Sequence, residues 1–326
     1  MKKHSMSVIL SVLLLSGTVS AQETEKFPLD ISVTTDLVWY PASAYCSGST
    51  HYAPVTGIYD QIQARTTLSA SYRIPVSLPF FPETGMPFRD TNVTFTGGLE
   101  LTPVSLMPEL SVSFTPAAFL VFSAGGMAGT GWELSGIQGI AGYTTDRQKY
   151  DSLTPFGSWY LCGYVNGTIL FDTAALWPGD WHHIVMAASY EIEYRTLTGT
   201  SSTVWDWQTT KGCADGWQYD QYYLLGYRMP GTVSLAGVSA ELYGHYNASD
   251  YGDTADTFSG GFMSVELCPL MQLKLAGRDT LSAMVDFKAR RSFRENHTTE
   301  DEEPLLTYDG REWYFERIAL RWKHTF

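Results

Sequence analysis

The sequence lacks any hydrophobic run long enough for a transmembrane helix once its first 21 residues are set aside. A membrane helix needs about 18 to 20 predominantly apolar residues. Clear helical periodicity is also missing from the rest of the chain. If the protein enters a membrane, these absences leave a β-barrel as its form, because only helices and closed barrels satisfy all backbone polar groups in lipid.

Positive charge and cysteine are both scarce. The formal net charge is −13 at pH 7, which argues against nucleic acid as a partner. The four cysteines, Cys46, Cys162, Cys213 and Cys268, have spacings that match no zinc signature. We therefore expect no metal and no cofactor. In an exported protein these cysteines could form disulfides. We expect one loop-to-loop bridge among Cys46, Cys162 and Cys213, and which two of them pair is left open.

The first 21 residues have the composition of a secretory signal peptide. Lys2 and Lys3 supply a basic start, residues 8–15 form an apolar stretch, and small residues lead up to Ala21. This order predicts cleavage after Ala21 and export from the cytoplasm. The expected organisation is a signal peptide over 1–21 and a single barrel domain over 22–326.

Period-2 patterns, aromatic residues and glycines are abundant. Aromatic residues make up 14% of the chain, which also holds 29 glycines. Residues 183–195 and 61–76 alternate between apolar and polar, as a strand with one greasy face does. In the second half, short turns at 177–181, 228–232 and 277–279 alternate with long loops near 144–162, 197–219, 246–260 and 293–311. The glycine-rich stretch 125–131 is interpreted as a turn. The pattern predicts an all-β, antiparallel, up-and-down transmembrane barrel of about 12 strands, with 10 to 14 left open.

The last ten residues alternate without a break. Their apolar face carries Ile318, Leu320, Trp322 and Phe326, with His324 as the one imperfect member. Their other face carries three bases, Arg317, Arg321 and Lys323. An exposed strand of this kind invites aggregation in a soluble protein, but it suits the closing strand of a barrel.

Together these features resemble Gram-negative outer-membrane β-barrel proteins of the porin-like class, without pointing to one family. The resemblance implies residence in the bacterial outer membrane, contact with its lipid, and export through the periplasm. It also implies that the barrel-assembly machinery recognises Ile318, Leu320, Trp322 and Phe326 as an assembly signal. A homo-oligomer is left open.

The inward strand faces carry the residues most relevant to function. We expect a basic wall and an acidic wall to face each other across the lumen and to create a transverse field. The alternative is that these charges are salt bridges that only hold the wall together. The predicted basic pore-lining residues are Arg65, Arg73, Lys274, Lys288, Arg290, Arg317, Arg321 and Lys323, and the acidic ones are Glu100, Asp172, Glu191, Glu193 and Glu241.

No catalytic constellation is expected. His182 and His183 form the only histidine pair and are interpreted as interfacial, and Asp250, Asp253 and Asp256 as a solvated acidic loop. The leading hypothesis is a non-enzymatic channel for diffusion or facilitated uptake of a small solute. A structural or surface-interaction barrel with a filled lumen is the alternative. A transporter of hydrophobic solutes, of the fatty-acid type, and a barrel hydrolase remain further alternatives.

Overall fold

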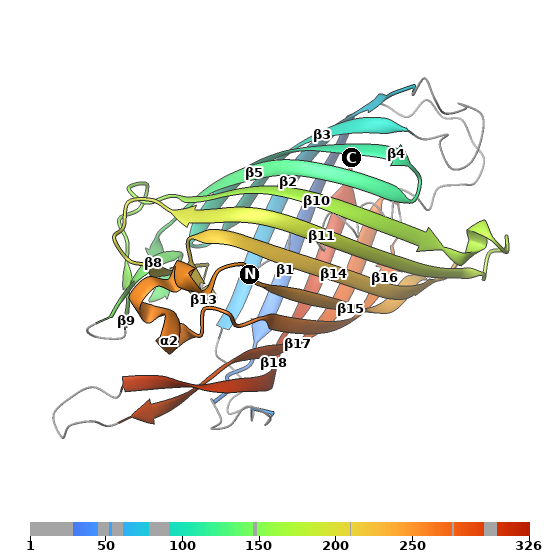
Figure 1. The fold of residues 1–326 in the computed structure, drawn as a ribbon. Helices are drawn as coiled ribbons and strands as arrows, with labels where there is room; N and C mark the ends of the chain where they lie inside the picture. Colours follow the sequence, from blue (N-terminus) through green and yellow to red (C-terminus); the bar gives the residue numbers. More distant parts are fainter. Residues whose placement is uncertain are drawn as a thin grey trace.

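The chain folds into a closed barrel of twelve antiparallel strands, which confirms the predicted fold class (Figure 1). The computed structural model describes residues 29–44, 52–53, 61–77, 91–145, 149–208, 210–275, 277–296 and 305–326. The predicted signal peptide lies outside these residues. The barrel strands are β1 (Leu29–Tyr40), β2 (Gln61–Pro75), β3 (Asn92–Thr102), β4 (Ser105–Ala117), β5 (Leu120–Gly131), β10 (Tyr160–Asp172), β11 (His183–Leu197), β14 (Gly216–Arg228), β15 (Val233–His245), β16 (Ser264–Lys274), β17 (Asp279–Asn296) and β18 (Leu305–Thr325).

The last strand closes the barrel against the first. β18 pairs with β1 from Ser32 opposite Thr325 to Trp39 opposite Ile318. The backbone N–H of Phe326 extends this seam by donating to the carbonyl of Ile31 at 2.9 Å. Closure leaves no unpaired strand edge in the barrel wall, which lipid would not tolerate.

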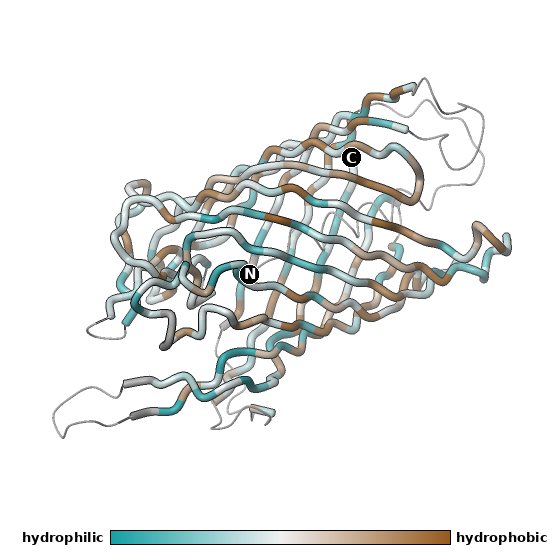
Figure 2. The backbone as a smooth tube through the Cα atoms, viewed as in Figure 1, coloured by the Kyte–Doolittle hydropathy of each residue, from teal (hydrophilic) through white to brown (hydrophobic). Residues whose placement is uncertain are grey.

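Hydrophobic and hydrophilic residues alternate along the barrel strands (Figure 2). On the exterior, large apolar side chains remain exposed, including Leu68, Leu110, Ile169 and Leu225. After β10 come the 3-10 helix η1 (Thr173–Ala175) and then a short turn that exposed Trp177 and Trp181 bracket. Such aromatic residues are typical of the membrane–water interface. Among the described residues, no helix is long and apolar enough to cross a membrane.

The long loops at one end of the barrel carry their own structure, which the sequence patterns did not predict. A four-stranded sheet, here called the cap, has the order β13 (Thr210–Ala214), β12 (Val204–Trp207), β8 (Ile140–Thr144) and β9 (Lys149–Ser152). A hairpin of β6 (Glu133–Leu134) and β7 (Ile137–Gln138) precedes it, and η2 (Ala248–Thr254) and α2 (Ala255–Phe258) lie in the loop after β15. Long loops face outward in this class, so the cap lies at the extracellular end.

Two expectations are wrong. Residues 125–131, expected as a turn, belong to strand β5. Their missing side chains leave room for neighbours: a Cβ on Gly125 would lie 2.6 Å from the Tyr164 hydroxyl, and one on Gly129 would lie 2.4 Å from the Trp207 ring. The glycines therefore serve close packing in the interior. Likewise, β17 and β18 continue as a hairpin through parts of the expected loop 293–311.

The expected loop-to-loop disulfide is also wrong for the described cysteines. No bridge joins Cys162, Cys213 and Cys268, and Cys46 lies outside the described residues. Cys162 is not in a loop: it lies on the inward face of β10, and its thiol donates to Glu193 Oε2 at 3.4 Å. The sequence pattern predicts a loop through residue 162, whereas β10 begins at Tyr160.

Candidate functional site

The candidate site is the lumen, and its first element is a chain of ion pairs across four adjacent strands. Arg65 on β2 has Nη2 at 2.5 Å from Asp36 Oδ2 on β1 and Nη1 at 3.1 Å from Glu100 Oε2 on β3. Arg321 on β18 donates from Nε to the other oxygen of Asp36 at 2.7 Å. Asp36 is 2% exposed and Arg321 is 6% exposed. Two bases and two acids thus alternate around this part of the wall.

A second ion-pair group lies on β16, β17 and β18. Arg317 bridges two carboxylates: its Nη2 donates to Glu266 at 2.8 Å and its Nε contacts Asp286. All three residues are buried. Buried charges are tolerated when they are paired and hydrogen-bonded, and this pairing is the arrangement that the salt-bridge alternative predicts.

A β-bulge adds an acid that the sequence analysis missed. Asp286 pairs with Arg317 and the next residue, Phe287, pairs with Phe315, so Glu316 has no partner position on β17. Two consecutive residues, Glu316 and Arg317, are therefore buried in the interior. Glu316 Oε1 accepts from Lys288 Nζ at 3.1 Å. A strict period of 2 places Glu316 on the lipid face, and only the bulge reverses it.

Most of the predicted basic residues are paired. In addition to the contacts above, Arg290 donates to Glu312 at 2.6 Å, another acid that period-2 counting from the terminus placed wrongly. Arg73 and Lys323 are half-buried, and Lys274 is exposed at the end of β16. The acids offset much of the positive charge expected on this wall. That these bases line a pore stays a prediction.

The predicted acidic residues lie at different depths. Glu100 belongs to the first ion-pair chain, Glu191 accepts from Asn166 at 3.3 Å, and Arg195 lies 2.7 Å from Glu193. Glu241 is buried on β15, directly opposite Glu266 on β16. Asp172 lies at the periplasmic end, where it accepts from the Ala174 N–H at the start of η1 and contacts His183 Nδ1, both at 2.9 Å. The structure does not bring these five acids into one group.

Three carboxylates come close enough to suggest a cation site. The ligand atoms of Glu266, Asp286 and Glu316 lie within 4.8 Å of one another. Arg317 and Lys288, however, contact all three and supply positive charge. The donor set therefore fits an ion-pair cluster better than a metal centre.

The interior has a hydroxyl face on one side. Eleven half-buried serines and threonines lie at inward positions of β1 to β5. Apart from Pro75 and Gly98, no inward residue of β2 or β3 in the described ranges is apolar. The hydroxyls bond to one another, with Ser71 Oγ and Thr96 Oγ1 at 2.9 Å and Ser32 Oγ and Ser69 Oγ at 2.9 Å. The half-buried members of this hydroxyl face are Thr34, Thr67, Ser69, Ser71, Thr94, Thr96, Thr102, Ser111, Ser113, Thr115 and Ser123.

A second part of the interior is an apolar face whose side chains are buried against one another. Large side chains lie in it with almost no exposed surface, such as Tyr222 at 1% and Met284 at 1%. Within the described residues, β2, β3 and β4 contribute nothing to this apolar face. Its members are Val38, Val121, Leu170, Val185, Ala187, Tyr222, Leu224, Leu235, Cys268, Leu270, Met284 and Ala319.

The cap reaches into the barrel mouth through Gln208. This buried residue follows β12 and has φ +51°, an uncommon conformation for a residue with a side chain. Its Nε2 donates to Glu100 Oε1 at 2.9 Å and to Ser105 Oγ at 2.8 Å. The preceding Trp207 stacks on Tyr160 of β10, with ring centroids 4.9 Å apart. Gln208 thus connects the cap to the ion pair between Glu100 and Arg65.

The cap is also held at a second part of the rim. Tyr251 of η2 donates its hydroxyl to the Gly212 carbonyl at 2.8 Å, and Arg291 of β17 donates to that hydroxyl at 3.1 Å. Burial raises the pKa of Tyr251, so the phenol keeps the proton that it donates. Contacts at β3 and at β17 anchor the cap on two well-separated parts of the rim.

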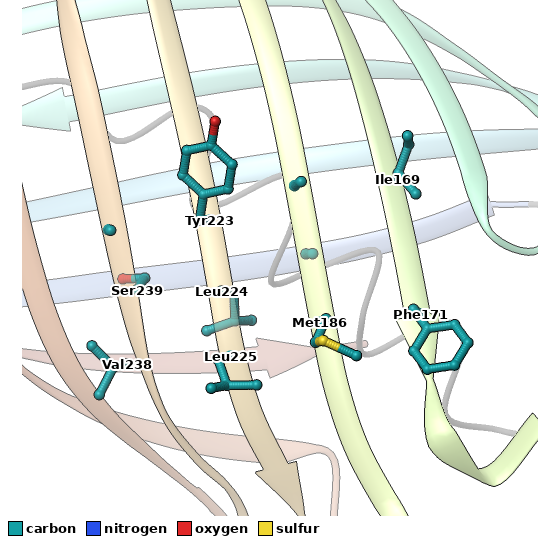
Figure 3. Close-up of a pocket in the computed structure, with 11 residues that line it drawn as sticks. Ile169, Phe171, Met186, Tyr223, Leu224, Leu225, Val238 and Ser239 are labelled. Carbon is teal, nitrogen blue, oxygen red and sulfur yellow. The ribbon is translucent and has the colours of Figure 1, made fainter.

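The exterior wall carries one further feature, a lipid-facing groove of about 550 Å³ on β10, β11, β14 and β15. Figure 3 shows Phe171, Met186 and Leu225 along it, with Tyr223 at one end. Ala188 and Ala240 contribute small side chains to its lining. Because the groove is on the outer surface, it is separate from the lumen.

Comparisons with known proteins give only weak similarities. No family model matches the chain, and no curated protein matches it either. DcaP, an outer membrane channel of Acinetobacter baumannii, is 9% identical, with 94% of this chain and 100% of that chain covered and a TM-score of 0.38. An outer membrane channel from Pseudomonas putida F1 is also 9% identical, with the same coverage and a TM-score of 0.45.

OmpF of Salmonella typhi, solved in complex with daunomycin, is 8% identical over 91% of this chain and 97% of that chain, with a TM-score of 0.37. The closed antiparallel barrel with an apolar exterior places this chain among the bacterial outer-membrane β-barrel proteins.

Proposed function

We propose that this barrel is an outer-membrane channel through which small polar solutes pass along the hydroxyl face. The observation that carries the proposal is the contrast between the two sides of the interior. Inward hydroxyls on β1 to β5 are half-buried, whereas the apolar face opposite them is closed by large side chains. A solute path would therefore be off-centre and would follow β2, β3 and β4.

The ion pairs support this placement. Arg321, Asp36, Arg65 and Glu100 lie on the adjacent strands β18, β1, β2 and β3 and are already paired with one another. A chain of paired charges contributes polarity and shape to a constriction while leaving little net charge there. The cap lies above it and contacts Glu100. Solute access from outside would thus depend on the position of the cap.

A second candidate function is a surface-interaction barrel with a filled lumen. The packed apolar face and the two-sided anchoring of the cap favour it, because both reduce the space for a path. In that case the structured cap would be the surface that meets a partner.

Planar-bilayer conductance tests the channel with two matched substitutions. Ser111 and Val112 are neighbours on β4, and they face the lumen and the lipid respectively. Ser111→Trp places a large ring on the hydroxyl face, so we expect it to abolish most of the conductance. Val112→Trp places the same ring in lipid, and we expect native conductance. A correctly folded native protein that gives no current would contradict the channel and favour the filled barrel.

A further inference from the structure

The chemistry of the hydroxyl face points to the class of solute. Serine and threonine hydroxyls each donate one hydrogen bond and accept others, so they can replace the water around a neutral polar solute. On three successive strands, Ser71, Thr96 and Ser111 pair directly across the sheet, and all three are half-buried. The row below them consists of Arg73, Thr94 and Ser113. Hydroxyls therefore recur along and across this face.

Fixed charge on this face is limited. Arg73 lies in the lower row, and Glu109 on β4 accepts from the Tyr164 hydroxyl at 2.8 Å. Towards the extracellular end, Arg65 has both Asp36 and Glu100 as partners. Each partner is itself shared, since Asp36 also contacts Arg321 and Glu100 also contacts Gln208. A charged solute entering this region would lose hydration and would meet no strong net counter-charge in return, which is costly. A neutral solute avoids that cost.

The opposite, apolar face adds a second preference. Apart from Tyr222 and Cys268, its side chains, among them Leu224, Leu270 and Met284, offer no hydrogen bonds. A solute that lies between the two faces would exchange hydrogen bonds on one side and place carbon-bound hydrogen atoms against the other. Polyols and sugars combine these two properties, whereas small inorganic ions have only the first.

We propose that the channel is selective for neutral polyhydroxylated solutes, which it recognises through the row formed by Ser71, Thr96 and Ser111. This inference rests on the proposed channel function and specifies its substrate class. The specificity-determining groups are hydroxyls in the lumen, and the charged residues mainly maintain the shape of the wall beside them.

Proteoliposome swelling with three solutes of similar size and different charge tests the proposal. Sorbitol is neutral, gluconate is an anion and N-methylglucamine is a cation, and all three carry a chain of hydroxyls. We expect sorbitol to enter about tenfold faster than either ion, because a difference of roughly 1.4 kcal/mol corresponds to a factor of ten. Equal rates for the three solutes would overturn the selectivity while leaving the channel intact. Swelling with none of them would contradict the channel itself.

A triple variant and a matched control locate the selectivity. Ser71→Ala, Thr96→Val and Ser111→Ala together remove the row of hydroxyls with little change in volume, and we expect sorbitol entry to fall about fivefold to tenfold. The control is Thr35→Val with Thr66→Val, which removes an exposed pair of hydroxyls, 3.3 Å apart, from the lipid face. The control should keep the native rate. Heat-modifiable migration on gels establishes that both variants are folded, and a folded triple variant with native sorbitol entry would overturn the proposal.

Discussion

Gln208 and Glu100 join two parts of the protein that lie more than a hundred positions apart in the sequence. The amide Nε2 of Gln208 donates to Glu100 Oε1 at 2.9 Å, while the other carboxylate oxygen lies 3.1 Å from Arg65 Nη1. Glu100 therefore belongs to the contacts of the cap and to the ion pairs of the wall at once. Movement of the cap would change the surroundings of Arg65.

Shortening Gln208 by one methylene should release the cap. Gln208→Asn keeps a residue type that tolerates positive φ, but its amide no longer reaches Glu100 and Ser105. Losing two hydrogen bonds weakens the closed arrangement by about 1–3 kcal/mol, which raises the open-to-closed ratio about 5- to 150-fold. Single-channel recordings would show longer open times.

The control for this variant is Gln221→Asn. Gln221 lies on the lipid face of β14, where it accepts from the Tyr223 hydroxyl. The same chemical change there should leave the open times as in the native protein. If Gln208→Asn also leaves them unchanged, Gln208 does not hold the cap closed.

Removing the carboxylate at the bulge should destabilise the barrel strongly. Glu316→Ala leaves the Lys288 ammonium buried without the carboxylate that contacts it at 3.1 Å. Breaking one half of a buried ion pair costs about 3–5 kcal/mol. Guanidinium unfolding, followed by tryptophan fluorescence, would show a lower midpoint. Glu133→Ala, which removes an exposed contact to Ser152, serves as a control and should change the free energy of unfolding little.

The double variant Lys288→Met with Glu316→Leu separates pairing from packing. Replacing both charges by apolar residues of similar size is often neutral or stabilising, so most of the lost stability should return. A double variant as unstable as Glu316→Ala would mean that the bulge itself requires the carboxylate.

Replacing the terminal aromatic ring should impair assembly more than folding. Phe326 is 62% exposed on the exterior, and its backbone N–H, not its ring, extends the seam to Ile31. Phe326→Ser therefore keeps the closing hydrogen bond but loses the ring that the resemblance assigns to the assembly signal. We expect less heat-modifiable protein in the outer membrane of cells and normal refolding in detergent. Thr325→Ala is the neighbouring control, and equal yields from both variants in cells would refute the role of the ring.

Features that depend on local alternation could be predicted from the sequence. Successive side chains of a strand point to opposite faces, so Arg317 and Arg321 were placed in the interior and Leu320 and Trp322 on the exterior before the fold was known. Their burial agrees: Arg317 is 3% exposed and Leu320 is 42% exposed. The even strand count followed from the loop and turn pattern.

Features that depend on distant partners could not be predicted in this way. Residues 125–131 are rich in glycine, which locally indicates a turn. The side chains that fill the space beside Gly125 and Gly129 come from distant residues, Tyr164 and Trp207. The cap sheet combines segments from two loops, and no periodicity in either loop indicated it. Glu316 was missed because one inserted residue reverses the face of every position before it.

The sequence by itself determined the barrel class, the approximate strand number and the faces of most strands, because alternation is a property of neighbouring residues and lipid requires every strand to pair. Only the tertiary structure decided which charges neutralise one another. Arg65 finds Asp36 and Glu100, and Lys288 finds Glu316, through strand register and a bulge. The tertiary structure also decided that the half-buried hydroxyls gather on β1 to β5 while β10, β11 and β14 to β18 carry most of the buried apolar cluster, since curvature and closure alone bring β2 to face β14.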